Sequence, residues 1–191
     1  MQYIIGIDLG GMSAKGGLFT VSGELLCEEK MKTNAADGFE GTVKLLAELS
    51  KKLTEQANVN FSAVQAIGVG APGVVDSRRG VVLRWSNFNW QNAPLAERLQ
   101  ELTGKKTYIA NDANIAALGE SKFGATSQYQ SSILLTIGTG VGGGMVFDGE
   151  LIEGYQSAGA KLRGYGYRAV KDRRCKAGKQ SGNLRRIRAC R

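Results

Sequence analysis

The chain has 191 residues, 42% of them hydrophobic, which suits one domain or a domain and part of a second, and no apolar run approaches the roughly 20 residues of a membrane span. Three cysteines, no histidine and no signal-peptide pattern exclude a disulfide framework and histidine chemistry, and favour a cytoplasmic protein. The net charge of +8 comes from residues 161–191, with twelve Lys or Arg and one acid, so we expect neither specific nucleic-acid binding nor membrane association by the rest of the chain.

A three-stranded meander is predicted at the start of the chain. Its strands are residues 1–8, 14–20 and 24–32, and glycines stand in both connecting turns. The short apolar runs are bounded by turn residues, which is typical of strands that pair with their neighbours in sequence.

An amphipathic helix is predicted after the meander. Asp37 and Glu40 have the spacing of a capping box, which would mark the first turn. Apolar residues then recur at helical spacing and should form its buried face: Phe39, Val43, Leu46, Leu49, Leu53 and Ala57.

Strands and helices alternate in the middle of the chain. Strands are predicted at residues 64–70, 81–85 and 107–110, with helices at about 94–103 and 113–122. This alternation predicts an α/β fold.

The segment after residue 130 repeats the opening pattern. A strand at residues 133–137 is followed by a glycine turn at 138–144 and a returning strand at 145–147. The repeat suggests an internal duplication and the start of a second domain. We therefore expect a small α/β domain at residues 1–120, the beginning of a large domain at 121–160, and a basic tail at 161–191.

The first glycine turn carries a carboxylate and a lysine. Asp8 ends the first strand, Gly10 and Gly11 follow it, and Lys15 lies on the returning strand. Main-chain N–H groups of such turns bind phosphate oxygens. Asp8 would then hold magnesium and Lys15 would neutralise phosphate charge. The alternative is an ordinary hairpin turn with solvated charges.

The second glycine turn contains a G-x-G-x-x-G pattern at Gly138, Gly140 and Gly143. A dinucleotide site requires a helix directly after these glycines, and a strand is predicted there instead. A hairpin around nucleotide phosphates, with the Thr139 hydroxyl as a further donor, is the better interpretation. The alternative is a flexible turn.

Polar residues follow two further strands. Asn111 and Asp112 lie between a strand and a helix, where α/β proteins often place active-site residues. An aspartate there can accept the proton of an attacking hydroxyl in phosphoryl transfer, or can be an ordinary helix cap. The turn at Gly73, with Asp76, and the segment 87–90 suit a polyol ligand, or are turn and core residues.

In this order the motifs resemble those of the ROK family, up to about Gly159. The segment from Asp8 to Lys15, with Met12 where threonine is usual, and the segment Gly138-Thr139-Gly140 are similar to the two phosphate segments of the family. The resemblance implies an actin-like, hexokinase-like (ribonuclease H-like) ATPase fold, in which two α/β domains enclose a cleft and only the start of the second domain is present here.

The resemblance also implies an activity and its residues. It implies an ATP-dependent hexose kinase with Asp112 as catalytic base and Asp8 acting on Mg²⁺ bound to ATP, while Asn111, Asn87 and the Gly73 turn fall on sugar-contacting positions. Residues 81–90 look most like bacterial glucokinases, which make glucose 6-phosphate from glucose. Kinases for N-acetylmannosamine, fructose or β-glucosides are the alternatives. Intact relatives are expected to be homodimers.

Two other classes remain open. Some ROK proteins are transcriptional regulators, with a DNA-binding helix-turn-helix ahead of the first strand; here that strand begins at residue 2. The other class is a non-catalytic remnant that binds nucleotide or sugar only. A glucose-phosphorylation assay together with a nucleotide titration would separate this remnant from a working kinase.

The resemblance fails near residue 160. Lys161 stands where the family has a sugar-binding glutamate, the following histidine is missing, and Cys175 is all that is left of a zinc cluster, so we expect no zinc site. The chain stops soon afterwards. We expect a truncated chain with a shifted reading frame after about residue 160, which would leave an inactive fragment. The alternatives are a genuine basic tail that binds nucleic acid or another acidic partner, and a solvated run of charges.

Overall fold

The main sheet has five strands in the order β3-β2-β1-β4-β8. Neighbours among β1, β2 and β3 are antiparallel, whereas β4 and β8 run parallel to β1. The computed structural model describes residues 1–137 and 141–153, and no helix within these ranges is long and apolar enough to cross a membrane. The five strands are β1 (Tyr3–Leu9), β2 (Ser13–Thr20), β3 (Leu25–Lys32), β4 (Val64–Ala71) and β8 (Lys106–Asn111).

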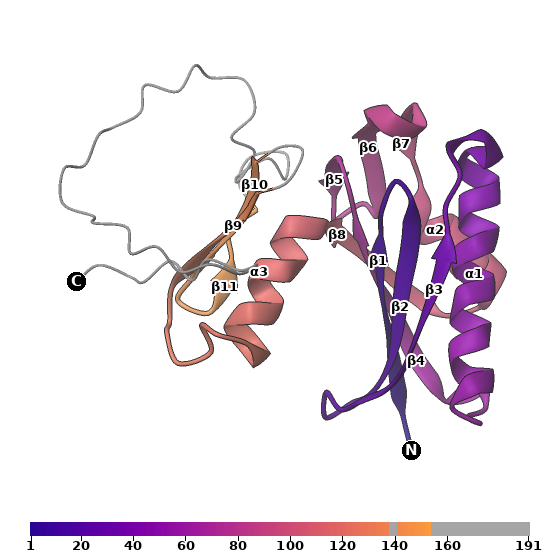
Figure 1. Cartoon of the computed structure of the whole chain (residues 1–191), viewed down its shortest axis with the longest axis horizontal. Coiled ribbons are helices and arrows are strands. Elements are labelled where there is room, and N and C mark those ends of the chain that lie inside the picture. The colour runs from indigo at the N-terminus through magenta and orange to yellow at the C-terminus, as the bar shows by residue number, and fades with distance from the viewer. Residues whose placement is uncertain (138–140, 154–191) are drawn as a thin grey trace, which may run out of the picture.

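Helices lie on both faces of this sheet. Figure 1 shows α1 (Gly38–Gln56) and α2 (Leu95–Thr103) on one face and α3 (Asp112–Phe123) on the other. The predicted meander, the α/β class and all three predicted helices are confirmed, with boundaries that differ by one or two residues.

The face of α1 that packs on the sheet follows from its spacing. Val43, Leu46, Leu49 and Leu53 are fully buried, as their helical period predicts. Each contributes roughly 1.5–3 kcal/mol through burial. Gly16 of β2 allows this close packing, since a Cβ there would lie 2.8 Å from the Leu53 side chain.

The predicted capping box at the start of α1 is wrong. A short 3₁₀ helix, η1 (Ala35–Asp37), precedes α1, and its cap is Asn34, whose side chain accepts a hydrogen bond from the Ala36 N–H at 3.0 Å. Asp37 makes no capping bond. The Glu40 carboxylate binds Arg98 of α2 instead, at 2.9 Å. A charge-assisted pair with a guanidinium is a stronger interaction than a bond to one main-chain N–H.

A small antiparallel sheet, β5-β6-β7, extends from the region between β4 and α2. It consists of β5 (Val74–Asp76), β6 (Val81–Trp85) and β7 (Trp90–Ala93), and a 3₁₀ helix, η3 (Ser86–Phe88), links the last two. Only β6 was predicted. The sheet is anchored by aromatic contacts: Trp85 stacks on Phe88 with ring centroids 3.9 Å apart, and Trp90 meets Phe39 of α1 edge-on at 5.1 Å. Another 3₁₀ helix, η2 (Phe61–Ala63), leads into β4.

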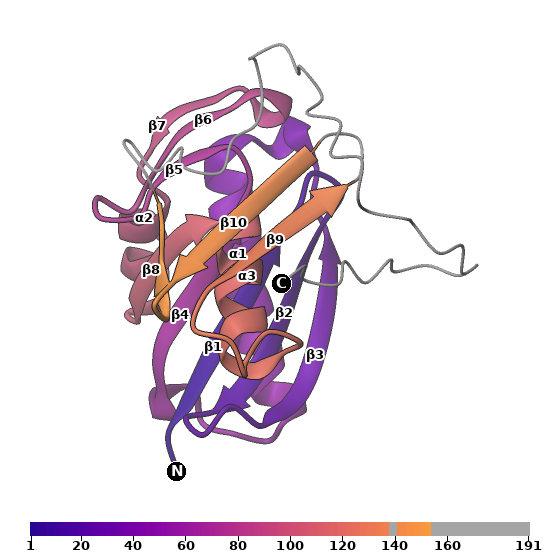
Figure 2. The same ribbon diagram turned by 90° about the vertical axis from the view of Figure 1, so that its left-hand side faces the viewer.

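A third sheet, β11-β10-β9, packs on the opposite side of α3. It comprises β9 (Ser132–Ile137), β10 (Val141–Phe147) and β11 (Glu150–Leu151). Figure 2 shows β9 and β10 crossing in front of α3. The predicted glycine turn was too long, because Gly142, Gly143 and Gly144 belong to β10. A Cβ at Gly144 would lie 2.6 Å from the Ala117 Cβ of α3, so packing against the helix explains that glycine.

Candidate active site

Two aspartates reach the same edge of the main sheet. In the strand register Asp8 of β1 lies beside Gly70 of β4, and Gly70 lies beside Ala110 of β8. Asp112 follows Ala110 by two residues and begins α3. The carboxyl ends of parallel strands are the usual place for ligand sites in α/β sheets. The topology therefore explains why residues distant in sequence meet here.

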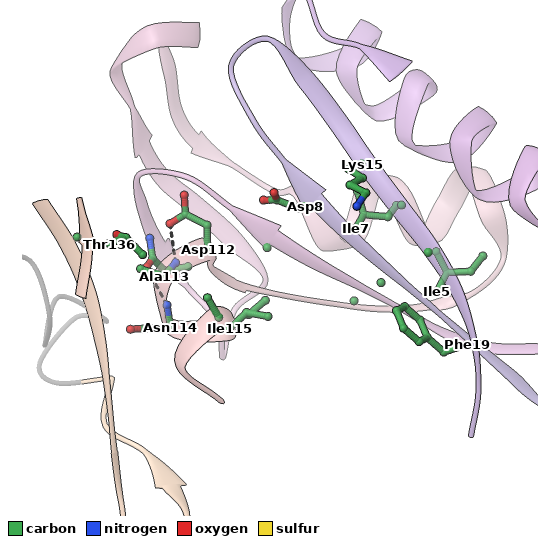
Figure 3. A pocket seen from close by; sticks show the side chains of 18 of the residues that line it. Ile5, Ile7, Asp8, Lys15, Phe19, Asp112, Ala113, Asn114, Ile115 and Thr136 are labelled. Atoms are coloured by element: carbon green, nitrogen blue, oxygen red, sulfur yellow. Dashed lines mark hydrogen bonds between the residues drawn. The ribbon is translucent and has the colours of Figure 1, made fainter. Parts of the chain in front are cut away.

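A cleft of about 920 Å³ opens at this edge and extends between the main sheet and α3. Its lining includes the predicted residues Asp8, Lys15, Asn111 and Asp112 and the predicted Gly73 of the β4–β5 turn. Figure 3 shows the carboxyls of Asp8 and Asp112 at one end of the cleft and Phe19 at the other.

The surroundings of the Asp8 carboxyl disfavour its charged form. Its pKa is raised above the ordinary value of 3.8, first by desolvation within the cleft and then by the charge of Asp112, while Lys15 acts in the opposite direction. The side chain opens to solvent, but neighbouring atoms displace part of its hydration shell. The two carboxylates would repel each other less with a cation between or beside them.

Mg²⁺ is a cation that suits this position. This ion is usually bound by one or two carboxylates together with water and substrate phosphates. Asp8 and Asp112 supply two carboxylates, and the described parts of the chain contain no group of three or more His, Cys, Asp or Glu that would form an all-protein metal cage. The donor set therefore fits a metal that arrives with a phosphate ligand.

Asn111 ties the β4–β5 turn to the start of α3. Its side-chain Oδ1 accepts a hydrogen bond from the Asn114 N–H at 3.3 Å, and its Nδ2 donates to the Gly73 carbonyl at 3.1 Å. Asp112 accepts the Ala113 N–H through Oδ1 at 2.8 Å. Asn111 is thus a helix cap and also faces the cleft, so the cap alternative and the site alternative both apply to this junction.

Gly73 needs to be glycine at this turn. Its φ of 91° lies in the left-handed region, and a Cβ would collide with the Arg84 carbonyl of β6. The turn can therefore lie close against the small sheet while its carbonyl points to Asn111.

Two hydrogen bonds of Gly10 hold the first glycine turn in its conformation. The Gly10 N–H donates to the Ser13 carbonyl at 2.9 Å, and the Gly10 carbonyl accepts the Thr33 hydroxyl at 2.9 Å. Gly10 and Gly11 do not line the cleft as it stands. Lys15 does, with its Nζ paired to Glu28 of β3 at 2.9 Å. An exposed pair of this kind contributes about 0–1 kcal/mol, so Lys15 is able to exchange its partner.

The other predicted positions lie elsewhere. Asn87 is exposed on η3 and does not line the cleft, and Trp90 of the same segment is core. Gly138, Thr139 and Gly140 lie outside the described residues, as do Lys161, Cys175 and the rest of the tail.

Sequence reasoning missed three polar residues that line the cleft: Glu28 of β3, Asn114 of α3 and Thr136 of β9. Thr136 had a local signal, because it interrupts the apolar residues of its strand. Asn114 had a weaker signal, since an asparagine in the first turn of a helix is also common as a capping residue.

The chain is similar to known sugar kinases and regulators. The model of the ROK family matches residues 4–181, which takes the match beyond residue 160 into the basic segment. A glucokinase of Thermotoga maritima is 36% identical over 160 residues, which cover 83% of this chain and 49% of that protein. A xylose repressor of Caldicellulosiruptor bescii is 35% identical over 151 residues, 79% of this chain and 38% of that protein.

The fold agrees with these matches. The crystal structure of a ROK family glucokinase from Streptomyces griseus, in complex with glucose and AMPPNP, superposes with a TM-score of 0.72 at 33% identity, over 80% of this chain and 47% of that one. The chain thus spans about half the length of the relatives it matches. Its strand order, its helices and its matched segments together identify the chain as a member of the ROK family.

Proposed function

We propose that the cleft is the nucleotide and sugar site of an ATP-dependent hexose kinase. The observation that carries this proposal is the meeting of Asp8, Lys15 and Asp112 at one edge of the main sheet. The two carboxylates and the lysine ammonium group suit a pair of substrates. One substrate carries a metal ion and several phosphates, and the other is neutral and must lose a proton.

In the proposed reaction Asp112 accepts the proton of the hexose hydroxyl as its oxygen attacks the γ-phosphorus of ATP. The new bond joins that oxygen to phosphorus, and the bond from phosphorus to the bridging oxygen breaks, so that ADP leaves. Asp112 Oδ1 is occupied by the Ala113 N–H, which orients the carboxylate and leaves the other oxygen to take the proton. Mg²⁺ bound with ATP would neutralise phosphate charge beside Asp8.

The remaining residues would position the substrates. Lys15, which lines the cleft, would contact phosphates, and Asn111 and the Gly73 turn would contact the sugar. The family resemblance adds phosphate contacts from the glycines at 10–11 and a sugar contact from Asn87, which lie outside the cleft lining, and phosphate contacts from the segment 138–140, which lies outside the described residues. Holding both substrates in a reactive geometry is worth roughly 7–11 kcal/mol of the barrier in favourable cases.

Glucose is the proposed hexose, with glucose 6-phosphate as the product. The support is the number of relatives described as glucokinases, among them the Thermotoga maritima protein. β-Glucosides, N-acetylmannosamine and fructose are the alternative substrates of the same chemistry. We also propose that residues 1–120 form the small domain and 121–160 the beginning of the large one, with the cleft between them.

Titration with Mg²⁺·AMPPNP tests the proposal on the chain itself. The wild-type chain should bind the nucleotide in a Mg²⁺-dependent way, and Asp8→Asn should weaken this binding by about tenfold, since one charge-assisted contact is worth roughly 1.5–3 kcal/mol. Glu48→Gln, which removes one negative charge from the exposed face of α1, is the matched control. A wild-type chain that binds neither AMPPNP nor glucose at millimolar concentrations would overturn the proposal.

A further inference from the structure

The outer face of the third sheet is apolar and exposed. Gly142 and Gly144 of β10 pack toward α3, so the residues of β9 that pair with them share that inner face. The alternate residues of β9 point the opposite way. Their side chains are large, apolar and exposed: Ile133 at 69%, Leu135 at 43% and Ile137 at 80%. Figure 2 looks onto this face of β9 and β10. A contiguous apolar patch of this kind marks an interaction surface.

β9 is also a free edge of its sheet. Among the described strands it pairs with β10 alone, so the main-chain groups along its other side have no partner in a described strand. Such an edge is a template for pairing with another strand, and proteins ordinarily protect it with charged residues, proline or short length. β9 has six residues, and none of them is charged, proline or glycine.

The other outer strands of the described sheets have the protection that β9 lacks. β7 is uncharged but has four residues, and β11 has two. Four outer strands carry charged residues: Glu28, Glu29, Lys30 and Lys32 on β3, Lys106 on β8, Asp76 on β5 and Glu150 on β11. Within the part of the chain that the structure describes, β9 alone combines a length of six residues with an uncharged edge.

A second copy of the chain is the occupant that suits this edge. Residues 154–191 hold twelve Lys or Arg and one acid, with no more than two consecutive apolar residues, which is not the composition of a strand that matches β9. β9 itself is complementary to a second β9 that runs antiparallel to it. A register centred on Leu135 places Leu135 opposite Leu135 of the second copy and Ile133 opposite its Ile137, so apolar residues meet on the outer face.

We propose that the chain forms a two-fold symmetric dimer in which the β9 strands of two copies pair antiparallel, edge to edge. The third sheets of the two copies then join into one continuous sheet, with α3 of both copies on the same face. The pairing gives the free main-chain groups of β9 their partners and removes part of the apolar row from water. This interface is separate from the proposed kinase chemistry, because Leu135 does not line the cleft.

Analytical ultracentrifugation of the 191-residue chain at micromolar concentration tests the pairing. The wild-type chain should sediment with twice its mass of 20.4 kDa. Leu135→Lys places two lysines opposite each other at the two-fold axis, and Leu135→Glu places two glutamates there. Each variant should weaken the dimer by about a hundredfold or more, because both copies lose an apolar contact and like charges then face each other. An equimolar mixture places lysine opposite glutamate and should restore the dimer.

Two further variants separate the edge from the face and from folding. Phe147→Lys is the matched control, because Phe147 lies on the outer face of β10, away from the free edge, and is 61% exposed. It should leave the dimer intact. Ile137→Lys should dissociate the dimer as Leu135→Lys does, and the 80% exposure of Ile137 means that the fold tolerates the change. Circular dichroism of each variant should match that of the wild-type chain.

Four results would show that β9 is not the seam. The first is a monomeric wild-type chain, which would leave the edge to residues 154–191 or to another protein. The second is a wild-type chain that forms assemblies without a defined size. The third is a mixture of folded Leu135→Lys and Leu135→Glu chains that stays monomeric. The fourth is a Phe147→Lys variant that dissociates as strongly as Leu135→Lys, which would mean that the copies pack face to face.

Discussion

The Asn111 side-chain amide donates a hydrogen bond to the carbonyl of Gly73, 38 residues earlier in the chain, at 3.1 Å. The same side chain caps α3 through the Asn114 N–H. One residue therefore couples the β4–β5 turn to the helix that carries Asp112, and a shift of the turn would be transmitted to the proposed base.

Removing this coupling should destabilise the fold in two separable steps. Asn111→Ser keeps a helix cap and loses the bond to Gly73, whereas Asn111→Ala loses both. We expect a loss of about 1 kcal/mol for the serine variant and about 2 kcal/mol for the alanine variant, measured as the free energy of unfolding in urea. Asn34→Ala, which removes the cap of η1 and an exposed hydrogen bond to the Asp37 carboxylate at 3.4 Å, should cost less than Asn111→Ala. Equal losses in both Asn111 variants would show that the bond to Gly73 contributes nothing.

The raised pKa of Asp8 predicts a stability that depends on pH. Because the pKa in the folded state lies above the ordinary 3.8, folding is favoured most below pH 3.8, where Asp8 is protonated in both states, and this contribution is lost as pH rises through the folded-state pKa. Asp8→Asn cannot ionise. It should therefore be more stable than wild type at pH 7, and this advantage should vanish near pH 3.5.

Urea unfolding of both proteins at several pH values between 3.5 and 7 measures this difference. Other carboxyls titrate in the same range, but they are common to both proteins and cancel in the comparison. An Asp8→Asn variant that is less stable than wild type at pH 7 would show that the charged carboxylate makes a net favourable contact.

Two glycines near the site should respond in opposite ways to alanine. At Gly144 a Cβ would lie 2.6 Å from the Ala117 Cβ and 2.8 Å from the Ala113 carbonyl, so Gly144→Ala should force β10 away from α3 and cost about 1–3 kcal/mol. At Gly119, inside α3, a Cβ would have no neighbour within 4 Å. Gly119→Ala should stabilise the helix by roughly 0.5–1 kcal/mol.

Amide hydrogen exchange in β9 and β10 is the suitable measurement for Gly144→Ala, because the effect should be local. Protection in these strands should fall while protection in β1 and β4 stays the same. If amide exchange in β10 were the same in Gly144→Ala as in wild type, the added Cβ would be accommodated without loosening the contact between α3 and β10.

Glucose phosphorylation by the chain should stay below detection in a coupled assay. The family resemblance places a sugar-binding glutamate at the position of Lys161 and a histidine after it, and losing such anchors removes much of the positioning that lowers the barrier. A gene carrying the alternative reading frame past residue 160 should recover activity. Turnover by the present chain that disappears in Asp112→Asn would show that the cleft is already sufficient for catalysis.

The sequence predicts those parts of the fold that depend on local pattern. The strands β1, β2 and β3 and the buried face of α1 follow from spacing alone. The end of α2 follows from the glycine at position 104, which adopts a left-handed φ of 66°. β5 and β7 were missed because they have three and four residues and pair only within the small sheet. The role of Glu40 was mistaken because its partner, Arg98, lies 58 residues away.

The candidate site likewise has residues that the sequence predicts and residues that it does not. Asp8 and Asp112 stand at strand ends, so an edge of the sheet that collects both could be predicted. Asn114 and Thr136 could not be placed from sequence, because their proximity depends on how β9 and β10 pack on α3. Gly142 and Gly144 were assigned to a turn for the same reason: their neighbour is a helix, and no local pattern records it.

The aromatic cluster of the small sheet determines what intrinsic fluorescence can report. Both tryptophans of the chain, Trp85 and Trp90, are buried there, in contact with each other and with Phe88. Their emission will follow the loosening of β6, β7 and α1. No tryptophan lies on β9, β10 or α3, so detachment of these strands from the helix will not change a tryptophan environment directly. A fluorescence melting curve will therefore report unfolding on one side of the cleft and not on the other.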